Sequence, residues 1–435
     1  MFVKGQKSFV FVYFQLISFL LMGEFVNAQN DLNYYIKMAQ QNSPLINDNQ
    51  NQSKANQIEA ERLKAFYTKP QIGITANYLF SPIISTDNNK TSFESNSNGA
   101  SHYFGYDLGT SNGGQYQALL NITQPLFNGQ RYQTASEQLS VFSQINQNNI
   151  KLSAHDMQKI ITDQYILCLQ DNKQTQYAEG MVKLLTDQKD VLKKLVESSI
   201  YKQSDLTLLN IEFQNFLAQF TTFKANYRRD LMDLNILCGI NDTALIQLSN
   251  TNLALSSDVK TSLFLEKYNL DSLNLIAQQK SFELKYKPQL NIFANTGLNA
   301  VYEPTILNRL GMSAGLNFIY ILSDGNQKNI SRNKTQVLQQ SILFYKGNFL
   351  NQNAVRKAKI LGELRSYADR ISFAQQQLKD YDLLLSSYKK EILAGQLSFI
   401  NYFTILKNMA TAQKDYTLLY SQKESLINSY NYWNW

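Results

Sequence analysis

The sequence predicts a mainly α-helical fold with a smaller β portion, built from a helix–strand–strand–helix unit that occurs twice. Proline is absent between Pro125 and Pro288 and again after Pro304. Because proline breaks helix interiors, both stretches allow very long helices. Four segments of about ten residues alternate between apolar and polar side chains, as strands do. Short motifs also recur in the same order in the two halves of the chain.

The N-terminus predicts export from the cytoplasm. Lys4 and Lys7 precede an uncharged apolar run at 9–22, and Val26-Asn27-Ala28 provides a small-residue cleavage site. This pattern is typical of a secretory signal peptide, here residues 1–28, and the run is too short to span a bilayer of about 30 Å. An ordinary amphipathic first helix is the alternative, which the lack of a polar face disfavours.

The proline-free stretches carry the spacing of coiled-coil helices. Apolar residues recur at alternating intervals of four and three within 209–238 and within 402–419, which is typical of a packed helical seam. Their aromatic side chains are therefore expected to form core contacts. We expect long helices at about 130–197, 204–239, 326–391 and 398–430, joined in pairs by tight turns.

The alternating segments predict strands at about 70–80, 115–126, 288–299 and 309–322. One face of each is apolar, whereas the other carries Asn, Gln, Ser, Thr and Gly. A half-buried soluble sheet also alternates, but its wet face usually carries Lys and Glu. The pattern therefore favours membrane-spanning strands that line a polar lumen. The lumen-facing positions are expected to include Thr75, Asn77, Asn121, Asn291, Asn295 and Asn317.

Four strands are too few to close a barrel, since the smallest bacterial barrels have about eight. Open strand edges are not tolerated in lipid, because the bilayer offers no partner for unpaired backbone groups. We therefore expect the chain to oligomerise.

Three matches define the internal repeat, expected at 29–245 and 246–435. Lys69-Pro70-Gln71 recurs as Lys287-Pro288-Gln289 at an offset of 218, and Gly129 recurs as Gly325 at an offset of 196. The difference of 22 residues predicts a long exposed loop at 81–114 in the first copy. Near the turns between the long helices, 197–204 matches 391–398 at an offset of 194.

The residue inventory argues against an enzyme. The chain has two histidines and two cysteines, and none of them forms a catalytic or metal-binding motif. No catalytic residue, metal or cofactor is expected. The formal net charge of +7 is spread without a basic block, so nucleic-acid binding is not expected either.

The two cysteines test the first helical turn. The midpoint of Cys168 and Cys238 is residue 203, inside the turn expected at 198–204. Both should then lie at nearly the same height on facing helices. Two buried thiols are favoured over a disulfide, because helix axes usually pack 8–10 Å apart.

Several motifs together make the chain resemble the outer-membrane efflux protein family, the TolC-like channels. They are Leu32, Ala39, Asn42 and Pro44 near the start, the Pro-Gln pair before each first strand, Pro125–Gly129, and Gly395-Gln396-Leu397-Ser398. The resemblance covers the whole predicted mature chain.

The resemblance implies a homotrimer in the outer membrane, with a twelve-stranded β-barrel continued by a long α-helical periplasmic barrel. It also implies a passive exit duct for efflux or type I secretion. The helix tips would dock with a periplasmic adaptor that links the duct to an inner-membrane transporter. The expected tip residues are Ser199, Tyr201, Ser204, Gly395 and Ser398.

Two features depart from the family pattern. Its tip glycine is Gly395 in the second copy but Tyr201 in the first. The acidic tunnel-mouth position falls on Thr207 and Asn401, with Asp205 displaced by two residues. The transported substrate is left open. A secreted coiled-coil surface or adaptor protein without a pore is the alternative function.

Overall fold

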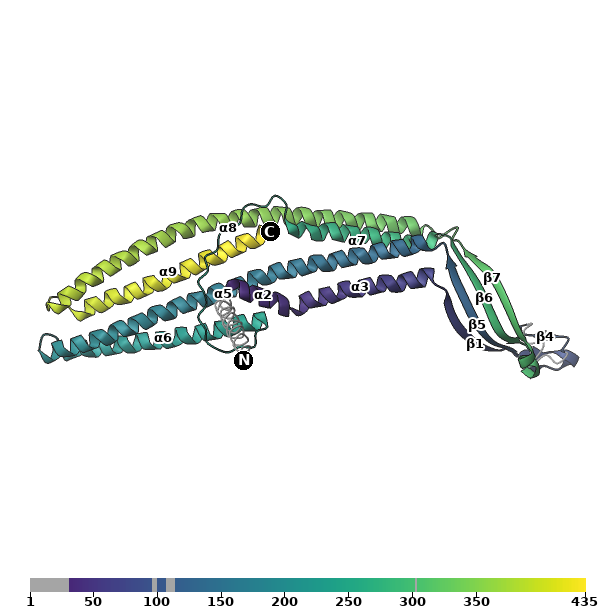
Figure 1. Ribbon diagram of the computed structural model, residues 1–435, viewed down its shortest axis with the longest axis horizontal. Helices are drawn as coiled ribbons and strands as arrows, with labels where there is room; N and C mark the ends of the chain where they lie inside the picture. Colours follow the sequence, from purple (N-terminus) through teal and green to yellow (C-terminus); the bar gives the residue numbers. More distant parts are fainter. Residues whose placement is uncertain (1–30, 96–99, 107–113, 302) are drawn as a thin grey trace, which may run out of the picture. The chain divides into compact units, whose positions relative to one another are not determined.

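The computed structural model describes residues 31–95, 100–106, 114–301 and 303–435 (Figure 1). The predicted signal peptide lies outside these residues. The chain divides into two compact units, one formed by residues 51–146 with 267–344, the other by residues up to 50 with 147–266 and 345–435. Within the described ranges, no helix combines the length and the apolar character that crossing a bilayer requires.

The first unit contains a four-stranded sheet. Its strands are β1 (Gln71–Phe80), β5 (Gly114–Leu126), β6 (Gln289–Ala300) and β7 (Leu310–Ile319). They lie side by side in the order β1-β5-β6-β7, and every neighbouring pair is antiparallel (Figure 1). The four predicted strands are confirmed. β1 and β7 are the edge strands, each with one strand partner in the described chain.

The two helices that lead into the first strand of each repeat end just before a proline. α3 (Pro44–Thr68) ends two residues before Pro70, and α7 (Glu266–Glu283) ends in a 3-10 turn two residues before Pro288. A proline disfavours helical backbone at the residue that precedes it, so the chain becomes extended at both places. Arg332 on α8 (Gln327–Leu393) then ties α8 to α7 through two 2.7 Å hydrogen bonds to the Glu283 carboxylate.

The insertion at 81–114 differs from the predicted exposed loop. It contains a three-stranded sheet of β2 (Ile83–Ser85), β3 (Ser92–Glu94) and β4 (Tyr103–Phe104). Ile83 is buried in it, and the Asp87 carboxylate accepts the backbone N–H groups of Ser101 (2.6 Å) and His102 (2.8 Å). Strands of two or three residues are too short to produce a periodic signal in the sequence.

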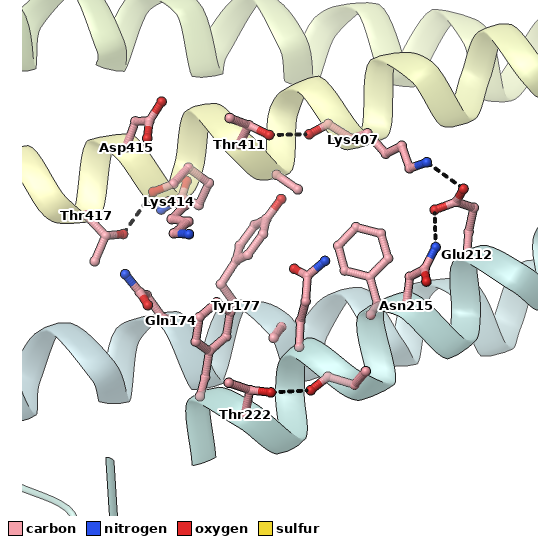
Figure 2. A pocket seen from close by; sticks show the side chains of 17 residues that line it. Gln174, Tyr177, Glu212, Asn215, Thr222, Lys407, Thr411, Lys414, Asp415 and Thr417 are labelled. Carbon is pink, nitrogen blue, oxygen red and sulfur yellow. Dashed lines mark hydrogen bonds and ion pairs between the residues drawn. The ribbon is translucent and has the colours of Figure 1, made fainter. Parts of the chain in front are cut away.

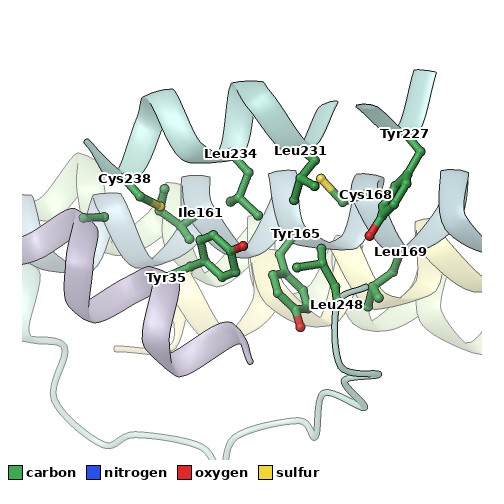
Figure 3. Close-up of a cluster of buried hydrophobic side chains, with 11 residues drawn as sticks. Tyr35, Ile161, Tyr165, Cys168, Leu169, Tyr227, Leu231, Leu234, Cys238 and Leu248 are labelled. Carbon is green, nitrogen blue, oxygen red and sulfur yellow. The ribbon is translucent and has the colours of Figure 1, made fainter. Parts of the chain in front are cut away.

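The predicted long helices are present, and most of their length lies in the second unit. α5 (Gly129–Glu197) is followed by α6 (Gln203–Cys238), and α8 by α9 (Phe399–Trp433). The short α2 (Leu32–Asn42) covers the far end of the α5–α6 pair, where Tyr35, Tyr165 and Leu234 are buried in one core cluster (Figure 3). A second cluster near the turns joins all four long helices through Leu185, Leu209, Ile392 and Leu406.

The cysteines show where the register of the first hairpin differs from the expectation. Both thiols are buried and free, and burial raises the pKa of each. Because α5 ends at Glu197 and α6 begins at Gln203, the turn is centred on residue 200 instead of 203. On α6, Cys238 therefore lies about 9 Å further from the turn than the position that is level with Cys168. Figure 3 shows Cys238 beside Ile161.

An extended segment at 240–262 connects the two sequence repeats within this unit, and we call it the strap. It has no regular secondary structure, and several of its backbone groups bond to side chains of α9 and of the residue after it. The Leu253 N–H donates to Glu424 (2.8 Å), and the Ser256 N–H donates to Asn431 (2.8 Å). The Asn434 side chain donates to the Ser257 carbonyl (2.8 Å). The predicted repeat boundary at 245/246 falls inside the strap.

Candidate functional site

The turn between α5 and α6 ends its helix with a left-handed residue. Ser199 has φ 62°, its N–H donates to the Val196 carbonyl (2.9 Å), and the Ile200 N–H donates to the Leu195 carbonyl (2.9 Å). This is the Schellman pattern of helix termination. Left-handed backbone favours glycine, so the serine at this position is strained.

The turn between α8 and α9 has the same geometry. Gly395 has φ 72°, and its N–H donates to the Ile392 carbonyl (2.9 Å). Gly395 therefore corresponds to Ser199 at an offset of 196, the offset that also relates Gly129 to Gly325. The predicted correspondence with Tyr201, at an offset of 194, is wrong. The 197–204 and 391–398 segments share only their first and last residue types, which was too little to define the register.

The corrected register also changes which residues correspond at the predicted acidic position. Asp205 and Asn401 are both the third residue of their helices, α6 and α9, so Asp205 is not displaced. Its carboxylate accepts the Lys202 N–H (3.0 Å) at the start of α6. Ser398 caps α9 by accepting the Ile400 N–H (3.3 Å). Thr207 donates to the Gln203 carbonyl (3.1 Å) within its own helix.

Tyr201 joins the two turns to each other. Its hydroxyl lies 3.0 Å from the Ile392 carbonyl and 2.8 Å from the Leu397 carbonyl. Its ring meets the Phe399 ring edge-on, with centroids 4.7 Å apart. The half-buried Tyr201 is therefore a structural tie between the repeats, whereas Ser199, Ser204, Gly395 and Ser398 are exposed.

Three large apolar side chains are exposed at these turns, and we call them the tip patch. Ile200, Leu393 and Ile400 are 53%, 57% and 59% exposed. Ile200 lies next to Gly395, since a Cβ added at the glycine would be 3.5 Å from its side chain. The tip residues predicted from the sequence do not include these three side chains. An exposed apolar cluster is typical of a protein-binding surface.

An open groove of about 770 Å³ lies between α5, α6 and α9 (Figure 2). Lys407 on α9 pairs with Glu212 on α6 at 2.6 Å, and Glu212 is only 4% exposed. The Asn215 side chain donates a longer hydrogen bond to the same carboxylate (3.4 Å). The pair links the two repeats through residues almost 200 positions apart. No local sequence motif could therefore predict this ion pair.

A buried carboxyl pair joins α5 to α6. Asp171 and Asp230 are 5% and 3% exposed, and one oxygen of each lacks a conventional hydrogen-bond partner. Burial and the neighbouring Asp230 raise the pKa of Asp171 to about 7. Burial opposes ionisation of Asp230, but its 2.7 Å contact with Arg229 prevails and lowers its pKa. A proton held by Asp171 and donated to Asp230 satisfies both orphan oxygens.

The sheet in the other unit has one polar face and one apolar face. Asn121 pairs with Asn295 across β5 and β6, and Asn291 pairs with Asn317 across β6 and β7. Asn121 donates to Thr75 (2.8 Å), and Asn77 donates to Gln117 (3.2 Å). The predicted lumen-facing residues therefore share one face, linked by side-chain hydrogen bonds across the strands.

The opposite face exposes large apolar side chains. Ile74, Met312 and Leu316 are 79%, 87% and 67% exposed, although such residues are normally buried. Nothing in the chain covers this face within the described residues. An exposed apolar face of this kind is typical of a surface that contacts another protein or a membrane.

Within the same limits, no group of three His, Cys, Asp or Glu side chains is arranged to hold a metal ion. The exposed features of the described residues are the polar and apolar sheet faces, the tip patch and the groove.

The chain has the fold of an outer-membrane channel of the TolC family. It matches the outer membrane protein VceC of Vibrio cholerae at a TM-score of 0.67 and 12% identity, over 93% of this chain and 95% of that one. The CmeC outer membrane channel of Campylobacter jejuni matches at 0.65 and 11%, over 93% and 85%. The Neisseria gonorrhoeae MtrE channel in its open state matches at 0.63 and 10%, over 93% and 88%.

No family model and no curated protein sequence matches this chain. The resemblance inferred from the short motifs is thus confirmed by structure, at a level of identity where the fold alone is shared.

The strained turn residue predicts opposite effects for matched substitutions. Ser199→Gly should stabilise the protein by about 0.5–1 kcal/mol, because glycine adopts the left-handed backbone without strain. Ser204→Gly, in the first turn of α6, should destabilise it, since glycine disfavours helix. Chemical unfolding followed by circular dichroism measures both. Two changes of the same sign would contradict the assigned turn geometry.

The carboxyl pair predicts a pH dependence of stability. Folded Asp171 keeps its proton to about pH 7, whereas the unfolded side chain loses it near its ordinary value of 3.8. Stability should therefore fall as the pH rises from about 4 to 7. Asp171→Asn should remove this fall and raise the unfolding temperature at pH 8. The exposed neighbour variant Asp233→Asn is the control, which should retain the wild-type slope between pH 5 and 8.

Proposed function

We propose that this chain is the protomer of an outer-membrane channel that serves as the exit duct of an efflux or type I secretion system. The carrying observation is the four-stranded sheet with an exposed apolar face, a hydrogen-bonded polar face and two edges open to further strands. Lipid would cover the first face, and the second would line an aqueous lumen. The predicted signal peptide agrees with an outer-membrane location.

Closure of the sheet requires further copies of the chain. Three copies would supply twelve strands, with β1 of one copy pairing with β7 of the next, and no edge would then face lipid. Tyr78 and Tyr116 lie together on the apolar face, with ring centroids 5.0 Å apart. They mark the end of β1 and β5 remote from α3 and α5, where a membrane strand typically carries an aromatic girdle.

The helical unit supplies the periplasmic duct in this proposal. The tip patch is the surface offered to a periplasmic adaptor, which would link the duct to an inner-membrane transporter. Transport is passive within this protein, because energy would be supplied by the transporter. The tie through Tyr201 and the Glu212–Lys407 pair would hold the two repeats together at the mouth of the duct.

Planar-bilayer conductance of the purified protein tests the proposal. A channel should give stable ionic conductance, and the protein should stay with the outer membrane until detergent is added. A secreted coiled-coil protein without a pore, the alternative function, would instead be released by salt or alkali and would conduct nothing.

The two sheet faces predict different effects of an introduced charge. Ile74→Arg and Leu120→Arg, on the apolar face, should impair membrane assembly, since a charge facing lipid costs about 2–4 kcal/mol at the midplane. Asn121→Arg and Asn295→Arg should assemble and alter conductance. Heat-resistant oligomer in outer-membrane fractions measures assembly. Equal tolerance at both faces would rule out the assignment of lipid and lumen.

The tip patch predicts the site of adaptor contact. Ile200→Asp and Ile400→Asp should leave a folded, conducting channel that no longer associates with a periplasmic protein in its native cells. In-cell photocrosslinking from position 396, an exposed position in the turn between α8 and α9, measures the association. Ile236→Asp is the control, because Ile236 is 73% exposed on α6 far from the turns. An equal loss of crosslinking in the control variant would argue against docking at the tips.

A further inference from the structure

We propose that the junction between the sheet and its helices binds the anionic headgroups of membrane phospholipids. This inference rests on the proposed function, since it assigns a lipid partner to one end of the membrane sheet. The site, which we call the junction belt, consists of Lys69, Phe127, Lys287, Tyr320 and Leu322. All of these residues belong to the unit that contains the sheet.

The register of the sheet brings the junction belt to one level. Gln71 and Thr123 pair near the helical ends of β1 and β5, Leu126 pairs with Leu290, and Gln289 pairs with Ile319. Each belt residue lies within three positions of one of these paired residues along the chain. They therefore lie where the apolar face of the sheet ends and the helices begin.

The apolar members of the belt are unusually exposed for side chains of their kind. Phe127 and Leu322 are each 90% exposed, more than any other large apolar residue among those described, and Tyr320 is 50% exposed. A lipid interface accommodates such side chains, since aromatic rings concentrate at the headgroup level of membrane proteins.

Phe127 also carries backbone strain. Its φ is 54°, in the left-handed region that bulky side chains rarely adopt. Glycine or asparagine would relieve the strain at this position, yet the chain has a phenylalanine that points into solvent. Strain of this kind persists where it positions a side chain for a role. Here that role would be to hold the ring in the membrane interface.

The two lysines supply the charge complementarity. Lys69 and Lys287 correspond at the offset of 218, and each precedes the proline that starts the first strand of its repeat. Neither forms an ion pair with a carboxylate of the described chain. Arg131 donates a 2.5 Å hydrogen bond to the Lys287 carbonyl, which fixes this part of the backbone. Long lysine side chains reach from an apolar surface to a charged headgroup, and phosphate is the anion that lies at this depth.

Lipid-class preference tests the lysines. The wild-type protein in mixed micelles should bind phosphatidylglycerol several-fold more tightly than phosphatidylcholine, measured by competition with a fluorescent phosphatidylglycerol. The double variant Lys69→Gln/Lys287→Gln should lose this preference. Lys379→Gln/Lys389→Gln is the control, because it removes the same charge from exposed positions on α8 and should retain the preference.

The depth of Phe127 is tested separately. Phe127→Trp should gain fluorescence that lipids brominated near the headgroup quench more than lipids brominated at the chain end, after subtraction of the wild-type signal from Trp433 and Trp435. Phe127→Gly should fold, since it relieves the strained backbone, and should lower the retention of the protein on vesicles.

Three outcomes would overturn the proposal. They are an unchanged lipid preference in the lysine double variant, equal competition by inorganic phosphate at millimolar concentration, and quenching of the Phe127→Trp variant only from the chain end. Failure of the proposed function is distinguishable, because it would abolish the conductance of the wild-type protein. A belt that does not bind headgroups would leave that conductance intact.

Discussion

The backbone at the two edges of the β1–β5–β6–β7 sheet imposes the constraint on which the remaining structure depends. Each edge leaves a row of N–H and C=O groups without a strand partner in the described chain, next to a face that exposes Ile74, Met312 and Leu316. Water tolerates the edges but not the apolar face, whereas lipid tolerates the face but not the edges. Only association with further strands satisfies both requirements. In the proposed channel, further copies of the chain would supply these strands.

The two repeats keep one register from the sheet to the helix tips, but they do not carry equally good turns. Gly395 and Ser398 are favourable residues for ending one helix and beginning the next. Their counterparts, Ser199 and Lys202, are not. Tyr201 compensates by tying the weaker turn to the stronger one through Ile392 and Leu397. The departure of the first turn from the glycine-containing pattern is thus balanced by a contact between the repeats.

Periodicity made the long helices and the four strands predictable, because both signals extend over ten or more residues. The polar face containing Asn121 and Asn295 followed from the same alternation. The alignment of the two helical turns was not predictable, because the two eight-residue segments share only two residue types. The predicted alignment was wrong by two residues, which the φ angles of Ser199 and Gly395 show. The Glu212–Lys407 and Asp171–Asp230 pairs depend on tertiary packing between distant helices, for which a single sequence contains no local pattern. The short strands around Ile83 were missed for lack of length.

The strap has a consequence for the order in which the chain can fold. Three of its backbone groups bond to the side chains of Glu424, Asn431 and Asn434, more than 170 residues later in the sequence. During synthesis, the first hairpin can form early from local contacts, and the Tyr165, Tyr227 and Asn235 side chains of α5 and α6 can already bond the first part of the strap. The part that bonds to Glu424, Asn431 and Asn434 stays without these partners until α9 has been made. Closure of such a distant contact is slow and leaves the segment open to proteases meanwhile. The C-terminal part of α9, together with Asn434, thus works as a clasp: the connection between the two repeats is complete only after this part of the chain has been made.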